Sequence, residues 1–368
     1  MLDPNTEEEL VDAVRAANDP LSIRGGGTRG MQTDGTPLTT SAMSGVTLYE
    51  PGALTIVAKA GTPVSEIEAV LDSENQMLAF EPMDHRALLG TEGVPTIGGV
   101  VATNTSGPRR VQAGACRDFL LGVRFVDGSG AVIKNGGRVM KNVTGYDLAR
   151  LMCGAHGTLG ILSEVSLKVL PKPSACGSLS LKGLTEDQAI SALSMALNSP
   201  FEVSGAVHHR GPVGQDPVTM IRVEGFENSV KYRLEELRKK LAAFGDCSVT
   251  FGNQTDGWRW VRDLEMFQNQ SGDIWRLSVA PSAAPGVVAN LAVEDALYDR
   301  GGGQVFVRVP EGTSVRSGMS GVPGHATRLR GASSEPRFHP EAEPLAKLAA
   351  GLRQNYDPKG ILNPGLMG

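Results

Sequence analysis

The sequence has few aromatic residues, no paired cysteines and no long apolar run. Aromatic residues make up 5% of the 368 residues, which leaves little material for a large apolar substrate pocket. No apolar stretch reaches the ~18 residues that a membrane-spanning helix needs, and the polar, acidic N-terminus is unlike a secretory signal. The cysteines are scattered, which favours a reducing cytoplasm: Cys116, Cys153, Cys176 and Cys247.

Charge and length narrow the class of protein. The formal net charge is -5, from 35 basic and 40 acidic residues, and no basic stripe stands out, so we expect no nucleic-acid partner. A chain of this length exceeds one ordinary compact core and favours two domains. Glycine is abundant, with 46 residues gathered between apolar segments. Such clusters indicate backbone that another molecule or chain segment approaches closely.

Apolar periodicity predicts alternating helices and strands. Thr6 is expected to cap a first helix that buries Leu10 and Val14. Further helices are predicted at 63–71, 146–153, 186–197, 230–244, 286–297 and 341–354. Strands are predicted at 21–24, 120–126, 131–134, 161–170, 202–209, 218–224, 274–279 and 304–309. The Pro171-Lys172-Pro173 segment predicts a domain boundary, which gives an α+β domain over 1–172, a second α+β domain over 173–340 and a C-terminal helix and tail over 341–368.

The first glycine-rich segment is Arg24-Gly25-Gly26-Gly27-Thr28. Successive glycines allow several N–H groups to converge on one anion, and the arginine adds positive charge. With Gly30 the segment satisfies G-x-G-x-x-G, but a loop follows where an NAD-binding fold needs a helix. A plain glycine-rich turn between two strands is the alternative interpretation.

Two more glycine-rich segments follow. The second, 96–107, combines glycines with several hydroxyl groups, which favours binding of phosphate or ribose over a tightly packed apolar turn. The third, 154–160, leaves a helix and enters a strand. Gly154 is explained as the helix end, whereas Gly157 and Gly160 are not, and His156 is interpreted as a loop side chain.

Together these segments resemble the FAD-binding domain of the vanillyl-alcohol oxidase superfamily, also called the PCMH-type FAD-binding fold. The resemblance also includes Gly145-Tyr146-Asp147-Leu148 and the C-terminal run from Gly360 to Gly365. It implies two α+β subdomains that bind FAD and a cap domain with an antiparallel sheet. In that family the first two segments wrap the pyrophosphate, the third lies along the adenine side, and the Asn-Pro element returns to the flavin. The implied FAD-contacting residues are Arg24, Gly25, Gly26, Gly27, Thr28, Pro82, Thr96, Ile97, Gly98, Gly99, Ala102, Thr103, Asn104, Ser106, Gly107, Gly154, Gly157, Gly160, Ile161 and Asn363.

Three other stretches, 106–110, 138–148 and 275–282, resemble the FAD-binding subunits of bacterial glycolate oxidases. This resemblance implies oxidation of glycolate, or a similar 2-hydroxy acid, to the 2-oxo acid. It also implies two partners, a larger FAD-containing catalytic subunit and an iron–sulfur subunit, and with them a peripheral location at the inner membrane as an alternative to a purely cytoplasmic one. Because Thr28 stands where covalent relatives often carry a histidine, we expect non-covalent FAD.

The chemistry of substrate oxidation is harder to assign from the sequence. The reaction needs a base, a cation for the carboxylate and often a metal. The His-x-Gly-Asp-Gly-Asn segment of metal-using relatives is missing, and we expect no metal site. His208 and His209 would point to opposite faces of a strand, while His325 and His339 are interpreted as ordinary histidines. Arg276 is the candidate carboxylate clamp, with a solvent-facing strand residue as the alternative.

We therefore expect an FAD-dependent oxidoreductase subunit, with an accessory or electron-relaying role favoured because the metal-binding segment is missing. The sequence has no C-x-x-C motif for an iron–sulfur cluster, so electrons must leave to a partner. The alternatives are a non-catalytic assembly subunit, and a stand-alone FAD-dependent oxidoreductase of the same superfamily.

Overall fold

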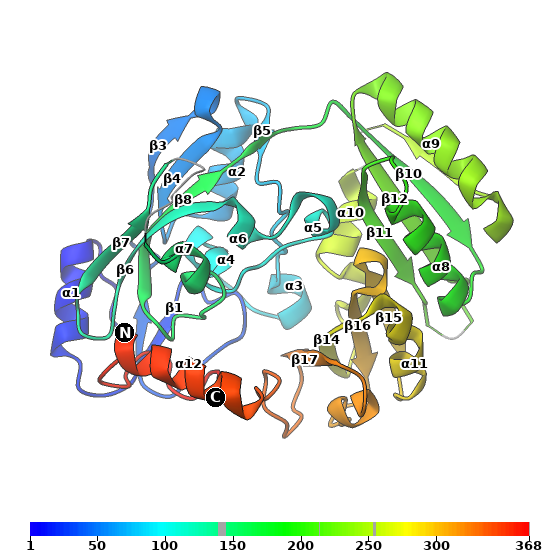
Figure 1. Cartoon of the computed structure of the whole chain (residues 1–368). Helices are drawn as coiled ribbons and strands as arrows, with labels where there is room; N and C mark the ends of the chain where they lie inside the picture. The colour runs from blue at the N-terminus through cyan, green and yellow to red at the C-terminus, as the bar shows by residue number, and fades with distance from the viewer. Residues whose placement is uncertain (139–144, 213, 253–254, 368) are drawn as a thin grey trace. The chain divides into compact units, whose positions relative to one another are not determined.

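The structure is a computed structural model that describes residues 1–138, 145–212, 214–252 and 255–367. It separates into two compact units, which are described in turn (Figure 1). The first contains Met1–Ser106, Gly114–Lys172 and Pro340–Gly368, and the second contains Gly107–Ala113 and Pro173–His339. The short segment Gly107–Ala113 therefore belongs by its contacts to the second unit, although its neighbours on both sides belong to the first. Local sequence gives no sign of this exchange.

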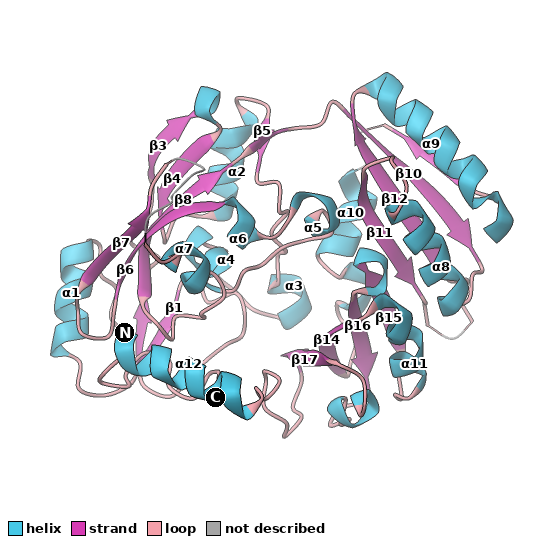
Figure 2. Ribbon diagram, viewed as in Figure 1, coloured by secondary structure: helices cyan, strands magenta, loops and turns pink. Residues whose placement is uncertain are grey.

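A five-stranded antiparallel sheet forms the centre of the first unit (Figure 2). Its strands run in the order β3 (Val46–Glu50), β4 (Thr55–Lys59), β8 (Ile161–Lys168), β6 (Leu120–Val126) and β7 (Val132–Gly136). A parallel pair, β1 (Leu21–Arg24) and β2 (Thr36–Thr39), and a short antiparallel pair, β5 (Gln76–Met77) and β9 (Leu170–Pro171), complete the strands of this unit. The helices are α1 (Glu7–Ala16), α2 (Val64–Asp72), α3 (Arg86–Leu89), α4 (Ile97–Ala102), α6 (Cys116–Phe119), α7 (Leu148–Met152) and α12 (Glu343–Tyr356).

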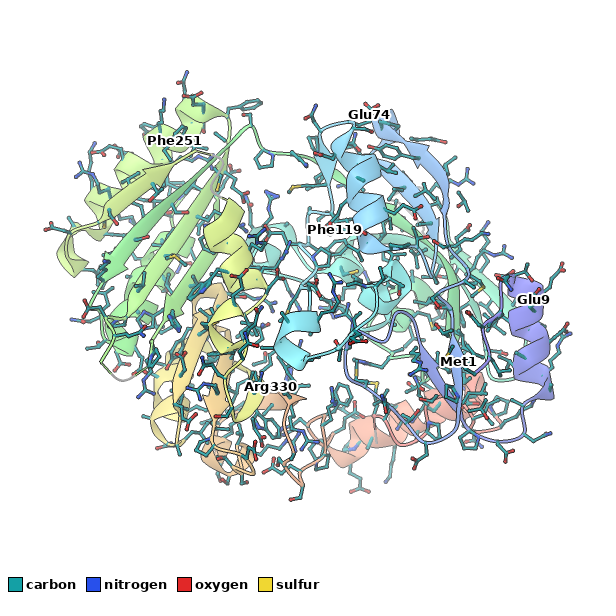
Figure 3. All side chains as sticks on the ribbon, turned by 180° about the vertical axis from the view of Figure 1, so that it is seen from behind. Met1, Glu9, Glu74, Phe119, Phe251 and Arg330 are labelled. Carbon is teal, nitrogen blue, oxygen red and sulfur yellow. The ribbon has the colours of Figure 1, made fainter. Side chains whose placement is uncertain are left out.

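Helix α1 begins as the sequence predicts. The Thr6 hydroxyl accepts a hydrogen bond from the Glu9 N–H at 3.1 Å, and Leu10 and Val14 are fully buried. These leucine and valine side chains pack in one core with β1 and with Leu362 of the C-terminal tail. The apolar face of α1 thus packs in one core with residues from both ends of the chain (Figure 3, where Glu9 marks this helix).

The second unit is an eight-stranded antiparallel sheet with helices packed against it. The strand order is β13 (Ser248–Phe251), β10 (Ala175–Lys182), β12 (Val218–Gly225), β11 (Val203–His209), β15 (Asp295–Asp299), β16 (Gln304–Val309), β14 (Asp273–Val279) and β17 (Gly324–Arg330). Helices α8 (Glu186–Leu197) and α9 (Glu227–Leu241) share a core with β10, β11 and β12, and α11 (Ala284–Ala289) packs on β14 and β16. Helices α5 (Arg110–Ala113) and α10 (Thr255–Arg262) also belong to this unit. Arg330, labelled in Figure 3, ends the edge strand β17.

The predicted fold class is confirmed, and the predicted helix at 286–297 is wrong. That range holds the end of α11, a turn and the buried strand β15. The run Asp295-Ala296-Leu297-Tyr298-Asp299 is apolar at its centre, and such short runs do not distinguish a helix from a central strand by periodicity. The first part of the second glycine-rich segment forms the helix α4.

Among the described residues, no helix combines the length and the apolar character that crossing a membrane requires. The same residues contain no group of three or more histidine, cysteine or acidic side chains that could hold a metal ion.

A bidentate ion pair ties α1 to the sheet of the first unit. The Glu7 carboxylate accepts hydrogen bonds from Arg124 of β6 at 2.5 and 3.1 Å and from the Ser163 hydroxyl of β8 at 2.6 Å. The hydrogen bond from Arg124 is the main cause that lowers the pKa of Glu7 below its ordinary value, and burial partly opposes it.

We predict that Glu7→Gln lowers the free energy of unfolding by about 1 kcal/mol at neutral pH, a modest value because the pair is partly exposed. A lowered folded-state pKa gives stability above the ordinary carboxyl pKa of about 4.3, and that stability is lost as the pH falls through the folded value. Denaturant unfolding at pH 7 and near pH 3 should therefore show a difference that disappears in acid. Glu8→Gln, at the exposed neighbouring position, is the control. An equal loss in both variants would contradict the role of this pair.

Candidate functional site

The first unit contains a cleft of about 900 Å³, including its opening to solvent. Residues from all three glycine-rich segments and from the C-terminal tail line it. The fold thus brings together segments that are separated by more than three hundred residues in the sequence.

The first glycine-rich segment presents its backbone to the cleft. The N–H groups of Gly25 through Arg29 donate to no protein acceptor within the described part of the chain. Gly27 is exposed, Thr28 is buried and the other three residues are half-buried, and all five line the cleft, so a ligand can reach these donors. A concave run of N–H groups is an anion-binding arrangement. This segment therefore fits a pyrophosphate.

The glycines of this segment are required by close contacts with the chain beside it. A Cβ on Gly26 would lie 1.6 Å from the Val94 carbonyl oxygen, and one on Gly25 would lie 2.3 Å from the Thr96 hydroxyl oxygen. Gly27, with a φ of 70°, has open space where its Cβ would be. The loop is thus pressed against the second segment on one side and open to the cleft on the other.

The second segment uses its polar groups differently. Thr96 caps α4 by accepting from the Gly99 N–H at 3.3 Å, and the Gly98 N–H donates to the Ala60 carbonyl at 2.8 Å. The Thr103 hydroxyl donates to the Gly99 carbonyl at 2.7 Å. These groups are committed to the protein, and Gly98 is needed because a Cβ would lie 2.7 Å from that of Ala60. The second segment supports the wall of the cleft more than it supplies donors.

The C-terminal tail closes the cleft through Asn363. Its side-chain oxygen accepts from the Ile23 N–H at 2.7 Å and from the Thr33 hydroxyl at 3.1 Å. Its amide nitrogen donates to the carbonyl oxygens of His156 at 2.9 Å and Ile23 at 3.3 Å. The side chain lines the cleft while its amide joins the first segment to the third. Asn363 therefore shapes the site.

Arg29 is a lining residue that the sequence interpretation missed. Burial is the main cause that lowers the pKa of this guanidinium to about 10, so it stays charged at neutral pH, and Asp84 opposes the shift. Its Nη1 lies 2.7 Å from Nδ1 of His85. With Arg24, it gives the cleft two cations beside the open N–H groups. A basic residue directly after a glycine-rich segment was the available signal.

Most of the predicted FAD-contacting residues line this cleft. Those that do so are Arg24, Gly25, Gly26, Gly27, Thr28, Thr96, Gly98, Gly99, Ala102, Thr103, Gly157, Gly160, Ile161 and Asn363. The others lie outside its lining: Pro82, Ile97, Asn104, Ser106, Gly107 and Gly154. Lining residues without a prediction are Ile23, Arg29, Met31, Thr33, Thr40, Ala60, Met152, His156, Leu162 and Leu366. Of the 138–148 motif, residues 139–144 lie outside the described residues.

The two adjacent histidines of β11 do face opposite ways. Nδ1 of His208 lies 2.9 Å from the Thr219 hydroxyl, and burial is the main cause that lowers the pKa of this imidazole to about 4. His209 instead pairs with Asp295 at 3.0 Å. The two imidazoles have separate partners, which explains both histidines as parts of the sheet.

Comparison with known proteins identifies the group to which this chain is related. Residues 1–136 match the family described as FAD binding domain. Glycolate oxidase subunit GlcE of Escherichia coli (strain K12) is 36% identical over 98% of this chain and 95% of its own length. The chain belongs to the GlcE family of glycolate oxidase subunits.

Two further relatives agree with this assignment. A D-lactate dehydrogenase of Anaerostipes hadrus is 30% identical over 49% of this chain and 38% of its own length. A solved alkyldihydroxyacetonephosphate synthase has a TM-score of 0.70 over 99% of this chain and 76% of its own, at 16% identity, which shows the shared fold alone. The predictions of FAD as cofactor, and of an FAD-dependent oxidoreductase that acts on 2-hydroxy acids, are confirmed by this family membership.

We predict that Gly26→Ala weakens FAD binding by about tenfold, because a methyl group must displace the Val94 carbonyl or the loop itself. The measurement is the affinity of the apoprotein for added FAD, followed by flavin fluorescence. Gly52→Ala is the control, since its Cβ would meet no atom within 4 Å. Unchanged affinity in a folded Gly26→Ala variant would remove this segment from the FAD site.

Proposed function

We propose that this chain is the FAD-binding subunit of a complex that oxidises glycolate, or a similar 2-hydroxy acid, to the 2-oxo acid and passes the electrons to a partner. The main support is the row of N–H groups from Gly25 to Arg29, which have no protein acceptor within the described residues and line the cleft of the first unit.

The residues of the cleft suggest how FAD is held. The open N–H groups of Gly25, Gly26 and Gly27 would bind the pyrophosphate, and Arg24 and Arg29 would balance its negative charge. Bound FAD supplies the capacity to accept a hydride from the substrate carbon. The chain's own contribution would be to fix the cofactor in place.

The route of the electrons depends on a partner. The sequence has no C-x-x-C motif, and the related protein is named as a subunit of an oxidase. We propose that the partners are a larger FAD-containing catalytic subunit and an iron–sulfur subunit. The complex would be cytoplasmic, as the scattered cysteines favour, and would associate with the inner membrane through its other subunits.

Native purification tests this proposal. We expect the tagged chain to co-purify with a second flavoprotein and an iron–sulfur protein, and the complex to reduce an artificial acceptor with glycolate. Mass spectrometry of the bound chains and the absorbance of FAD and iron–sulfur clusters are the measurements. A chain that remains without flavin after FAD titration would instead favour a non-catalytic assembly subunit.

We further predict that the FAD is not covalently attached. The described lining of the cleft contains no cysteine, and Thr28 lies in its wall where covalent relatives often carry a histidine. Acid precipitation should therefore leave the yellow colour in the supernatant. Colour retained in the pellet would contradict this expectation, and His156→Ala would then test the one imidazole among the described lining residues as the attachment point.

A further inference from the structure

Strand β14 of the second unit has one apolar face and one mixed face. Trp275 and Leu277 are fully buried in the core that contains α11. Because successive side chains of a strand alternate, Arg276 and Ser278 lie on the opposite face of the sheet. The arginine is therefore placed on the side away from the helix-covered core.

Both neighbouring strands add side chains to this face. Arg276 is opposite Thr327 of β17 and Phe306 of β16. Ser278 is opposite His325 of β17 and Gln304 of β16. Residues directly opposite each other share one face of a sheet, and diagonal neighbours are close enough for long side chains to meet. The result is a mixed patch on three strands, in which the polar side chains around Arg276 lie beside the buried, apolar Phe306 and Ile274.

The Arg276 guanidinium has neither a hydrogen bond nor an ion pair within the described part of the chain. Its side chain is half-buried. Burial is the main cause that lowers the pKa of Arg276, and the positive charge of Arg110 lowers it further. None of its guanidinium nitrogens is among the buried polar atoms without a partner, so the group reaches solvent and can be approached by an anion.

Arg300 brings a further positive charge to the same region. It lies in the turn between β15 and β16 with a φ of 55°, a strained conformation for an arginine. Burial is the main cause that lowers its pKa to about 10; Asp299 opposes this shift, and the charges of Arg110 and Arg276 add to it. The strand register agrees with this placement, because Gln304 of β16 is opposite both Asp299 and Ser278, and the Arg300 guanidinium forms an ion pair with Asp299 at 3.7 Å.

The turn that carries Arg300 is fixed by packing. A Cβ on Gly301 would lie 2.6 Å from Leu197, and one on Gly302 would lie 2.5 Å from Ile190, both on α8. The Asp299 carboxylate accepts from the Arg300 N–H at 2.7 Å. The position of Arg300 is thus determined by the fold, as a pre-organised binding residue requires.

We propose that Arg276, assisted by Arg300 and Arg110, forms a carboxylate-binding subsite for the 2-hydroxy acid, so that this chain binds the substrate itself. That the bound carboxylate belongs to a 2-hydroxy acid rests on the proposed function. A carboxylate accepts two parallel hydrogen bonds from one guanidinium and neutralises part of the repulsion among the three.

His325 supports a hydroxy acid as the ligand of this site. Burial lowers the pKa of its imidazole, and the charges of Arg276 and His339 lower it further, so the ring is neutral at neutral pH. A neutral imidazole diagonal to Arg276 can accept a hydrogen bond from the substrate hydroxyl. The patch thus contains a clamp for one substrate group and an acceptor for the other.

The test measures binding of oxalate to the FAD-loaded chain by titration calorimetry. Oxalate is a planar dicarboxylate without a hydrogen to transfer, so binding is separated from turnover. We expect Arg276→Gln to weaken oxalate binding by about tenfold or more, and Arg276→Lys to restore only part of it because lysine keeps the charge but not the planar fork. Arg238→Gln, on the exposed face of α9, is the charge-matched control and should bind oxalate normally.

Thermal stability separates a binding role from a structural one. Because the Arg276 side chain has no hydrogen bond or ion pair in the described residues and reaches solvent, Arg276→Gln should leave the unfolding midpoint nearly unchanged. Saturating oxalate should raise the midpoint of the wild type but not that of this variant. A lower midpoint together with unchanged oxalate affinity would overturn the proposal, as would equal binding of inorganic phosphate.

His325→Gln provides a second, independent measurement. Oxalate has no hydroxyl group, so this variant should bind it as the wild type does, while anaerobic flavin reduction by glycolate should slow. An unchanged rate would remove His325 from the site. FAD binding by the wild type separates the proposed function from the proposed carboxylate site. A wild-type chain that binds no FAD would contradict the proposed function. A chain that binds FAD, and whose Arg276→Gln variant binds oxalate as the wild type does, would contradict the carboxylate site alone.

Discussion

The four hydrogen bonds of the Asn363 side chain fix the shape of the cleft in which we propose that FAD binds. They connect the C-terminal tail with β1, with Thr33 and with the third glycine-rich segment, and they use the full capacity of an amide. The backbone reinforces them, since Leu21 and the tail exchange hydrogen bonds of 2.7 and 3.1 Å. Asn363 has a φ of 44°, which asparagine tolerates better than most residues. The cleft is therefore complete only when the last residues of the chain have docked on the first strand.

That dependence explains why the three glycine-rich segments are not equivalent. The first has backbone donors without protein acceptors among the described residues, whereas the donors of the second are used within the protein. Both need glycine, but for different reasons: Gly26 allows one loop to lie against another, and Gly98 allows a helix to lie against the end of β4. Composition alone cannot separate these roles, because it shows where backbone comes close and not which polar groups remain available.

Local signals in the sequence predicted local structure well. Helix α8 spans the predicted residues because Thr185 and Gln188 form a complete capping box, and β1 has the predicted bounds. The sequence-based predictions failed where contacts between distant parts of the chain determine the secondary structure or the surroundings of a residue. The buried strand β15 was predicted as a helix, because its apolar run fits both. Leu366 lines the cleft only because the C-terminal tail docks there. The sequence also could not show that Arg276 lacks a partner within the described residues, because its neighbours come from other strands. The superfamily resemblance identified the fold, whereas the roles of individual residues needed the structure.

The two proposed anion-binding sites use different donors. In the proposed FAD site, fixed backbone N–H groups would bind the pyrophosphate of a cofactor that stays bound, and they would need no side-chain ordering. In the proposed carboxylate site, guanidinium groups would bind a substrate that enters and leaves with every turnover, because solvent can stabilise them between cycles. Arg300 is paired with Asp299 at 3.7 Å, and glycines packed against α8 fix the turn that carries it. Arg276 stands on the neighbouring strand β14 and reaches solvent. A carboxylate that binds there would meet backbone that is already fixed, so little chain ordering would oppose its binding.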